Sequence, residues 1–184
     1  CGIAGIVSNR ISLEITIKDM VARLDHRGPD NSSYSINSNV ALGHSRLSII
    51  DLSASANQPM RSSSGNHSII FNGEIYNYKE LKKELNARGC QFNNQSDTEV
   101  ILNGYICDGI DFFKKIRGFF SLSIFDKKEQ TLILARDSHG KKPLFYIKHN
   151  GSFYFASELK AIIPQLQSVP SVNYESLSHY LWKG

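Results

Sequence analysis

The chain has 184 residues and a mass of 20.7 kDa; 41% of its residues are hydrophobic and 21% are charged. A chain of this size can bury enough apolar surface to fold as one domain without disulfide bonds or metals, and the composition excludes a disordered, collagen-like or coiled-coil protein. The net charge of +4 is mild and evenly spread, so we expect no nucleic-acid partner. The apolar runs are all far shorter than the roughly 20 residues that span a bilayer, so we expect no membrane partner.

The first part of the chain mixes short apolar strands with a helix. Residues 1–7 predict a buried strand. Residues 17–24 place their apolar side chains on one helix face, with Thr16 as the expected cap. The Gly-Pro pair within residues 26–30 ends this helix. Further strands are predicted over residues 40–42, 47–50 and 68–71.

Two helices then begin at recognisable caps. Asn77 and Ser96 are each followed three residues later by a glutamate, a pattern that resembles a capping box. The first box predicts a helix over residues 77–89. The second places Asp97 in the first turn of another helix.

The rest of the chain follows the two-residue period of strands. The expected strands cover residues 120–124, 131–135, 144–148 and 152–156, and helices are expected over residues 158–163 and 174–182. Asn150-Gly151 between the last two strands is a hairpin signal. Strands, then helices, then an antiparallel run predict an α+β fold with stacked layers, not an alternating doubly wound sheet.

The three cysteines, Cys1, Cys90 and Cys107, are odd in number and widely spaced, which is typical of neither a disulfide framework nor a zinc motif. The six histidines also lack metal-ligand spacing. Both observations favour a cytoplasmic protein without a structural metal. Cys90 and Cys107 lie in patterned segments and are expected to be small packed thiols.

Cys1 differs because, if it is the mature N-terminus, one residue carries both a thiol and a free α-amine. The thiol can serve as a nucleophile, and an amine with an ordinary pKa of about 8 can serve as its base. Asn72-Gly73 follows a predicted strand. An Asn amide and a Gly N–H can form an oxyanion hole, although Asn-Gly alone is more commonly an ordinary turn.

Three charged residues could bind charged groups of a substrate. The Arg46 guanidinium suits a carboxylate, although a single Arg before a strand is usually a surface residue. Glu74 and Asp97 could each receive an ammonium group, and Asp97 could equally serve only the start of its helix.

Eight motifs occur in one order along the whole chain. They are Cys-Gly-Ile-Ala-Gly from residue 1, His-Arg-Gly-Pro-Asp from 26, Gly-His-Ser-Arg-Leu-Ser-Ile-Ile-Asp from 43, Phe-Asn-Gly-Glu-Ile-Tyr-Asn from 71, Ser-Asp-Thr-Glu-Val-Ile-Leu from 96, Ala-Arg-Asp from 135, Lys-Pro-Leu from 142 and Ala-Ser-Glu-Leu-Lys from 156. Together they closely resemble the glutaminase domain of glutamine-hydrolysing asparagine synthetases, a branch of the class II glutamine amidotransferases. The resemblance implies one domain over residues 1–184, folded as a four-layer αββα sandwich of the N-terminal nucleophile hydrolase type.

The resemblance also implies a role for each candidate residue. Cys1, exposed by removal of an initiator Met, would attack the side-chain amide of glutamine with its own α-amine as base. Asn72 and the Gly73 N–H would form the oxyanion hole, and residues 26–30 would close over the substrate. The residues expected to bind glutamine are Arg46 at its carboxylate, Asp97 with Glu74 at its ammonium, and Ile49, Ile50, Asn72 and Gly73 along the pocket.

The expected partners are glutamine and a C-terminal synthetase domain. Full-length members of the resembling family continue into an ATP- and Mg-dependent domain, whose Ser-Gly-Gly-x-Asp-Ser loop does not occur here. We therefore expect an excised N-terminal domain that itself needs no cofactor or metal and supplies ammonia for asparagine formation. A homodimer is left open.

Three alternatives are weighed against this reading. The ammonia could serve a different carboxylate acceptor, or the chain could be a non-catalytic regulatory domain of the same fold. Hydrolysis of another amide would leave Arg46 and Asp97 together unexplained.

Overall fold

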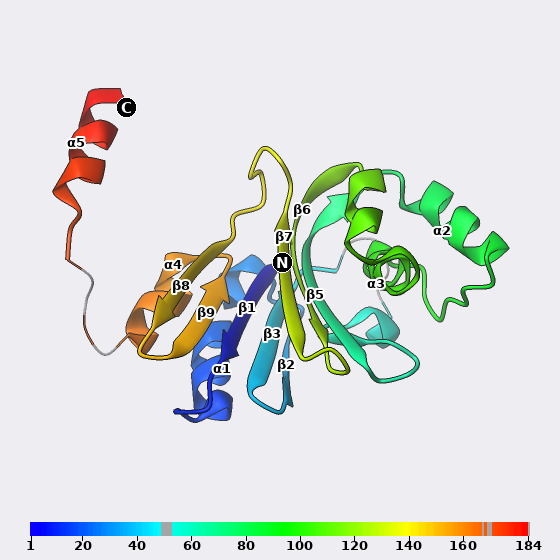
Figure 1. The fold of residues 1–184 in the computed structure, drawn as a ribbon, viewed down its shortest axis with the longest axis horizontal. Coiled ribbons are helices and arrows are strands. Elements are labelled where there is room, and N and C mark those ends of the chain that lie inside the picture. Colours follow the sequence, from blue (N-terminus) through cyan, green and yellow to red (C-terminus); the bar gives the residue numbers. More distant parts are fainter. Residues whose placement is uncertain (49–52, 167, 169–170, 184) are drawn as a thin grey trace.

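Two antiparallel sheets packed face to face, with helices on both outer sides, make up the structure (Figure 1). The computed structural model describes residues 1–48, 53–166, 168 and 171–183. The predicted α+β class and the four-layer αββα sandwich are confirmed. Ile49 and Ile50, and with them half of the strand expected over residues 47–50, lie outside the described residues.

The first sheet has the strand order β2-β3-β1-β9-β8, which puts the N-terminal strand at its centre. Its strands are β1 (Gly2–Val7), β2 (Asn31–Asn37), β3 (Val40–Arg46), β8 (Phe145–His149) and β9 (Ser152–Ala156). Helices α1 (Leu13–Ala22) and α4 (Leu159–Ile162) cover its outer face (Figure 1). The β8–β9 hairpin turns at Asn150 and Gly151, both with positive φ, as the Asn-Gly signal predicts.

The second sheet has the order β4-β5-β6-β7. Its strands are β4 (Met60–Arg61), β5 (His67–Ile75), β6 (Gly118–Asp126) and β7 (Thr131–Arg136). Helices α2 (Tyr78–Ala87) and α3 (Asp97–Asp108) cover its outer face. Short 3₁₀ turns complete the sandwich: η1 (Asp25–Arg27), η2 (Ala54–Ala56), η3 (Gly109–Lys115) and η4 (Ile163–Gln165). Helix α5 (Tyr174–Lys183) has no buried residue and stands apart (Figure 1).

The space between the sheets is an apolar core that fixes which way each strand faces. Its buried residues are Ile3, Val40, Leu42, Ile70, Phe125 and Phe155. Because side chains alternate along a strand, residues that share the parity of Ile3 on β1, Leu42 on β3 and Ile70 on β5 face the opposite sheet. This alternation brings Cys1, His44, Arg46 and Asn72 to the inner faces at one end of the sandwich.

Several local expectations need correction. Ser12, not Thr16, caps α1: its Oγ accepts a hydrogen bond from the Ile15 N–H at 3.5 Å, so the helix begins earlier than the apolar stripe indicates. The polar segment that forms β2 has no strand pattern of its own and is held by its pairing with β3. Leu47 and Ser48, expected in a strand, follow the end of β3.

The two predicted capping boxes form only in part. Ser96 caps α3 as expected, with its Oγ accepting from the Glu99 N–H at 3.3 Å. Asn77 precedes α2, but its side chain binds the main chain of Lys115 and Arg117 and makes no cap hydrogen bond.

The two remaining cysteines lie together at the C-terminal ends of α2 and α3. Cys90 packs against the apolar core beneath these helices, as expected. Cys107 is exposed, so its expected packed position is wrong. The two Sγ atoms are 3.0 Å apart and both thiols are free.

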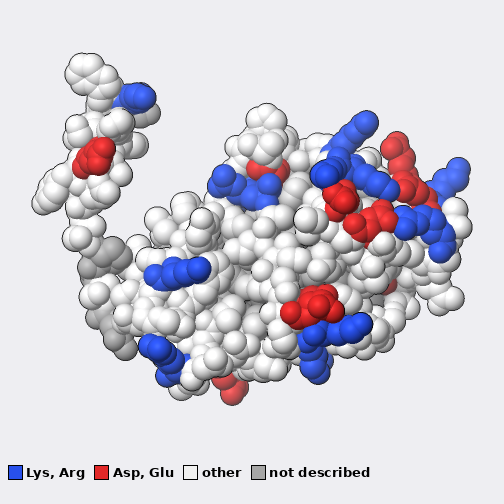
Figure 2. All heavy atoms as spheres, viewed as in Figure 1, with Lys and Arg blue, Asp and Glu red and all other residues white. Residues whose placement is uncertain are grey.

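Acidic and basic side chains are interspersed on the face that α2 and α3 present in Figure 2. Many are paired, as Arg88 Nη2 is with Asp108 Oδ1 at 2.6 Å and Lys115 Nζ with Glu84 Oε1 at 2.7 Å. Mixed charge of this kind produces no broad positive field on that face.

Candidate active site

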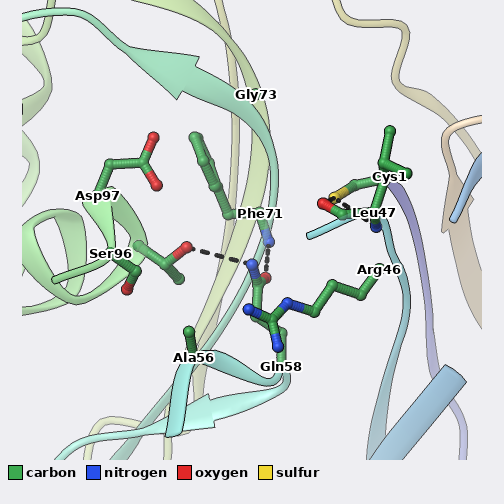
Figure 3. Close-up of a pocket in the computed structure, with 10 residues that line it drawn as sticks. Cys1, Arg46, Leu47, Ala56, Gln58, Phe71, Gly73, Ser96 and Asp97 are labelled. Carbon is green, nitrogen blue, oxygen red and sulfur yellow. Dashed lines mark hydrogen bonds between the residues drawn. The ribbon is translucent and has the colours of Figure 1, made fainter. Parts of the chain in front are cut away.

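A pocket that is partly open to solvent lies between the start of β1 and the start of α3 (Figure 3). It is lined by Cys1, Arg46, Leu47, Ala56, Gln58, Phe71, Gly73, Ser96, Asp97 and Thr98. Four of the residues that the sequence singles out, Cys1, Arg46, Gly73 and Asp97, therefore meet around one cavity. They come from three strand ends and a helix start that are distant in the chain.

The Cys1 thiol rests against the main chain of Leu47. The Sγ lies 3.5 Å from the Leu47 carbonyl oxygen, to which the S–H can donate, and the Leu47 N–H points at the Sγ with N and S 3.4 Å apart. An N–H donor at a sulfur stabilises negative charge that develops there. The main chain after β3 is thus placed to support a thiolate.

The surroundings of the Cys1 α-amine favour its neutral form. Burial, followed by the nearby cations of Arg27 and Lys142, lowers the pKa of this amine from 8.0 to about 6. Arg27 also fixes the residue, since its Nε donates to the Cys1 carbonyl at 3.0 Å while its Nη1 pairs with Glu158 Oε1 at 2.7 Å. At neutral pH most of the amine is therefore neutral and able to accept a proton.

The main chain of Gly73 faces the pocket because of the β5–β6 register. Gly73 lies opposite Phe120, whose N–H and C=O both bind Asp137 on the far side of β6. In an antiparallel pair this makes Gly73–Phe120 a non-hydrogen-bonded pair, so the Gly73 N–H points away from β6. A Cβ at Gly73 would lie 2.3 Å from the Phe119 carbonyl oxygen, so only glycine fits this close approach.

Asn72 lies on the opposite face of β5 from Phe71, toward the other sheet. Its side chain is only 2% exposed, and its amide nitrogen has no hydrogen-bond partner among the described residues. A buried donor without a partner costs roughly 1–3 kcal/mol. Such a donor in a native protein calls for an explanation, and a hydrogen bond to a ligand is one. Glu74, by contrast, is exposed and is not among the residues that line the pocket.

Arg46 brings a buried positive charge to the pocket (Figure 3). Its Nη1 donates to the Ser53 carbonyl at 3.0 Å and to Asn57 Oδ1 at 2.5 Å. The guanidinium is thereby held in place at the end of β3. Its five donors fit the two oxygens of a carboxylate.

Asp97 brings a buried negative charge to the other side of the pocket. Its Oδ2 accepts from the Ile75 N–H at 3.1 Å. Burial raises the pKa of Asp97 from 3.8 to about 6, against the opposing effect of main-chain donors such as the Ile75 N–H. Because burial makes the ionised carboxylate less stable, a cation bound beside it would stabilise it.

Other lining residues were not anticipated from the sequence. Leu47 and Thr98 lie inside two of the eight motifs, whereas Gln58 lies in none of them. The segment over residues 26–30 packs beside Cys1: Gly28 abuts the main chain of Ser45 and Arg46, and Asp30 Oδ2 accepts from the Ser48 N–H at 2.7 Å. Its closing over a substrate stays a prediction.

Among the residues described, no group of three or more His, Cys, Asp or Glu side chains is arranged to hold a metal ion. In the same part of the chain, no helix has the length and apolar character needed to cross a membrane.

The fold is the four-layer sandwich of the N-terminal nucleophile hydrolase type, and Cys1 directly precedes its central strand β1. The chain belongs to the glutamine amidotransferase domain family, whose match covers residues 1–184. Among solved structures, it resembles glutamine phosphoribosylpyrophosphate amidotransferase from Bacillus subtilis with a TM-score of 0.76. That match covers 88% of this chain and 43% of the other at 21% sequence identity, and so bears on the fold.

Curated relatives include enzymes with different names. The chain is 39% identical over 186 residues to asparagine synthetase [glutamine-hydrolyzing] 1 of Bacillus subtilis, covering 98% of this chain and 29% of that protein. It is 40% identical over 150 residues to amidase chry2 of Gibberella zeae, covering 80% of this chain and 22% of that protein. The chain therefore spans less than a third of the length of either relative.

Asp97 provides a test of the electrostatics of the pocket. Because its folded-state pKa is raised, the contribution of this group to stability is full below pH 3.8 and is lost as the pH rises through about 6. Asp97→Asn removes the buried charge, so it should raise the free energy of unfolding at about pH 7.5 by roughly 1–3 kcal/mol and change it little below about pH 4. Urea unfolding at the two pH values measures this difference.

Asp108→Asn is the matched control. The pKa of Asp108 is lowered to about 2, chiefly by its hydrogen bonds with Arg88 and Lys115. This variant should lose stability at neutral pH. If Asp97→Asn behaved in the same way, the charge of Asp97 would not be strained in the fold.

Proposed function

We propose that this domain hydrolyses the side-chain amide of glutamine to glutamate and ammonia. The observation that carries the proposal is the meeting of Cys1, Gly73, Arg46 and Asp97 around one pocket. A nucleophile, a donor for an oxyanion and two opposite charges are what an amino acid with a side-chain amide requires.

Hydrolysis proceeds in two stages. The Cys1 thiol gives its proton to the α-amine as the sulfur attacks the amide carbon, and the negative oxygen is stabilised by the Asn72 amide and the Gly73 N–H. The protonated amine then donates to the leaving nitrogen, so ammonia departs and a thioester remains. Water attacks the thioester with the neutral amine as base, which releases glutamate and restores the thiol.

The two opposite charges of the pocket match the carboxylate and the ammonium group on the α-carbon of glutamine. Arg46 binds the carboxylate, and Asp97 binds the ammonium. Arg46 and Asp97 are both buried and lie on opposite sides of the cavity, which supports these roles. The contribution of Glu74 to the ammonium site and of Ile49 and Ile50 to the pocket wall rests on the sequence resemblance.

In the full-length protein we propose that the ammonia serves an ATP-dependent synthetase domain that forms asparagine, as the name of the Bacillus subtilis relative suggests. The similarity to amidase chry2 favours a second candidate, an amidotransferase with another acceptor. The three free thiols support a reducing, cytoplasmic location. The unpaired amide of Asn72 and the lowered pKa of the Cys1 amine speak against a purely regulatory domain.

Removal of the nucleophile tests the reaction directly. Cys1→Ala should abolish glutamate release from glutamine, and one extra residue before Cys1 should do nearly the same because it turns the amine into an amide. Cys107→Ser, at the exposed thiol, should keep full activity. Coupled assays of glutamate and ammonia, with the N-terminus confirmed by mass spectrometry, decide the result. Activity that survives in Cys1→Ala would refute the proposal.

The pH dependence tests the base. The Cys1 amine must be neutral and Asp97 must be ionised, and both pKa values lie at about 6. We therefore expect kcat/KM to fall below about pH 6 through two ionisations, whereas kcat should lose only one because bound ammonium keeps Asp97 ionised. Initial rates between about pH 5 and 8 provide both profiles. A kcat that is flat across this range would exclude the amine as the base.

Substrate analogues test the two charges. Losing a buried, charge-assisted partner typically costs ~2–5 kcal/mol, about 30-fold or more in kcat/KM. Arg46→Ala should therefore discriminate poorly between glutamine and its decarboxylated analogue, and Asp97→Ala poorly between glutamine and its N-acetyl form. A variant that discriminates as well as the wild type would place its residue outside the substrate site.

A further inference from the structure

The main-chain N–H and C=O of Phe71, next to the proposed oxyanion hole, are each bound by a side chain. The N–H donates to Gln58 Oε1 at 2.6 Å, and the carbonyl lies 3.1 Å from His44 Nε2 (Figure 3 shows the Gln58 contact). Strand β4 pairs only with Ser68 and Ile69, so it ends before it could bind this peptide. We call Gln58 and His44 the Phe71 clamp.

Gln58 connects the two walls of the pocket. Its side chain is buried, and its Nε2 donates to Thr98 Oγ1 at 3.1 Å while its Oε1 holds Phe71. Thr98 follows Asp97 in the first turn of α3, and Phe71 precedes Asn72-Gly73 on β5. One amide side chain thus fixes the spacing between the ammonium site and the oxyanion hole.

His44 connects the two sheets at the same point. It lies two residues before Arg46 on β3 and is fully buried. Burial lowers the pKa of its ring to about 3, so the ring is neutral, and the Phe71 carbonyl can only accept, so Nε2 carries the hydrogen. The first sheet, which carries Cys1, is thereby tied to the strand that carries Asn72 and Gly73.

We infer that Gln58 and His44 are positioning residues that set the Asn72 amide and the Gly73 N–H against the oxygen of the amide group whose carbon Cys1 attacks. This inference rests on the proposed function. Oxyanion donors stabilise the transition state only when they are preorganised, and a displacement of 1 Å costs on the order of 10² in rate. Both clamp residues are neutral, so they hold the peptide without adding a charge beside the developing anion.

Gln58→Met tests the clamp because it keeps the volume of the side chain and removes both hydrogen bonds. We expect kcat to fall roughly 10- to 100-fold, with KM changed by less than about 3-fold. The Cys1 thiol adds to the carbonyl carbon of the aldehyde analogue of glutamine, and the former carbonyl oxygen then lies in the oxyanion hole. The affinity for this aldehyde should fall by the same factor as kcat, whereas that for glutamate should stay unchanged. Gln91→Met, at an exposed glutamine, is the matched control.

Three further variants keep the test decisive. Thr98→Val removes only the anchor of the Gln58 amide, so it should show a smaller loss of the same kind even if Gln58→Met does not fold. His44→Gln retains an N–H donor and should keep more activity than His44→Leu. A rise in KM at unchanged kcat, or an equal loss of affinity for the aldehyde and for glutamate, would overturn the positioning role.

Hydrogen exchange separates the clamp from the proposed function. Without substrate, protection of the Phe71 amide should fall in Gln58→Met and stay unchanged in Gln91→Met. If Gln58→Met loses protection of the Phe71 amide but the wild-type protein has no glutaminase activity, the clamp contacts stand and the proposed function is wrong. Unchanged protection in an active enzyme would overturn the clamp.

Discussion

The edge of β5 beyond the end of β4 is the constraint on which the pocket depends. Every N–H on that edge needs a partner, and after Ile69 no strand among the described residues supplies one. Gln58 takes the Phe71 N–H, Asp97 takes that of Ile75, and the Gly73 N–H between them faces the cavity. Because β4 is short, the Gly73 N–H is left free to face the cavity. For the same reason, side chains must bind the neighbouring N–H groups and fix the position of this strand edge.

The electrostatics of the pocket favour a ligand that carries one charge of each sign. Asp97 and Arg46 are buried with opposite charges on opposite sides, and burial raises the pKa of the carboxyl. The same burial lowers the pKa of the Cys1 amine. The charged forms of the Asp97 carboxyl and of the Cys1 amine are thus less stable in the protein than they would be in water. A zwitterionic amino acid would compensate both buried charges while leaving the neutral amine free to accept a proton.

Sequence patterns predict the elements whose signals are local. Three such elements are confirmed because each depends on neighbouring residues: the buried strand that begins at Gly2, the Ser96 cap and the Asn150-Gly151 turn. Strand β2 and the clamp have no local signal because they depend on distant partners: β2 has a polar sequence, and Gln58 acquires its role from Phe71 and Thr98. Similarly, the motifs identify the charged pocket residues but contain nothing to reveal that the Gln58 amide spaces Asp97 from the oxyanion hole.

The pocket also bears on which acceptor the ammonia serves. All of its lining residues lie between Cys1 and Thr98, and all of the proposed chemistry ends with free ammonia. Two relatives with different names, an asparagine synthetase and an amidase, match this chain at 39% and 40% identity. If the pocket binds only glutamine, none of its residues has to differ between proteins that pass the ammonia to different acceptors. The choice between the two candidate functions therefore belongs to chemistry outside this pocket, and the glutaminase step is compatible with either.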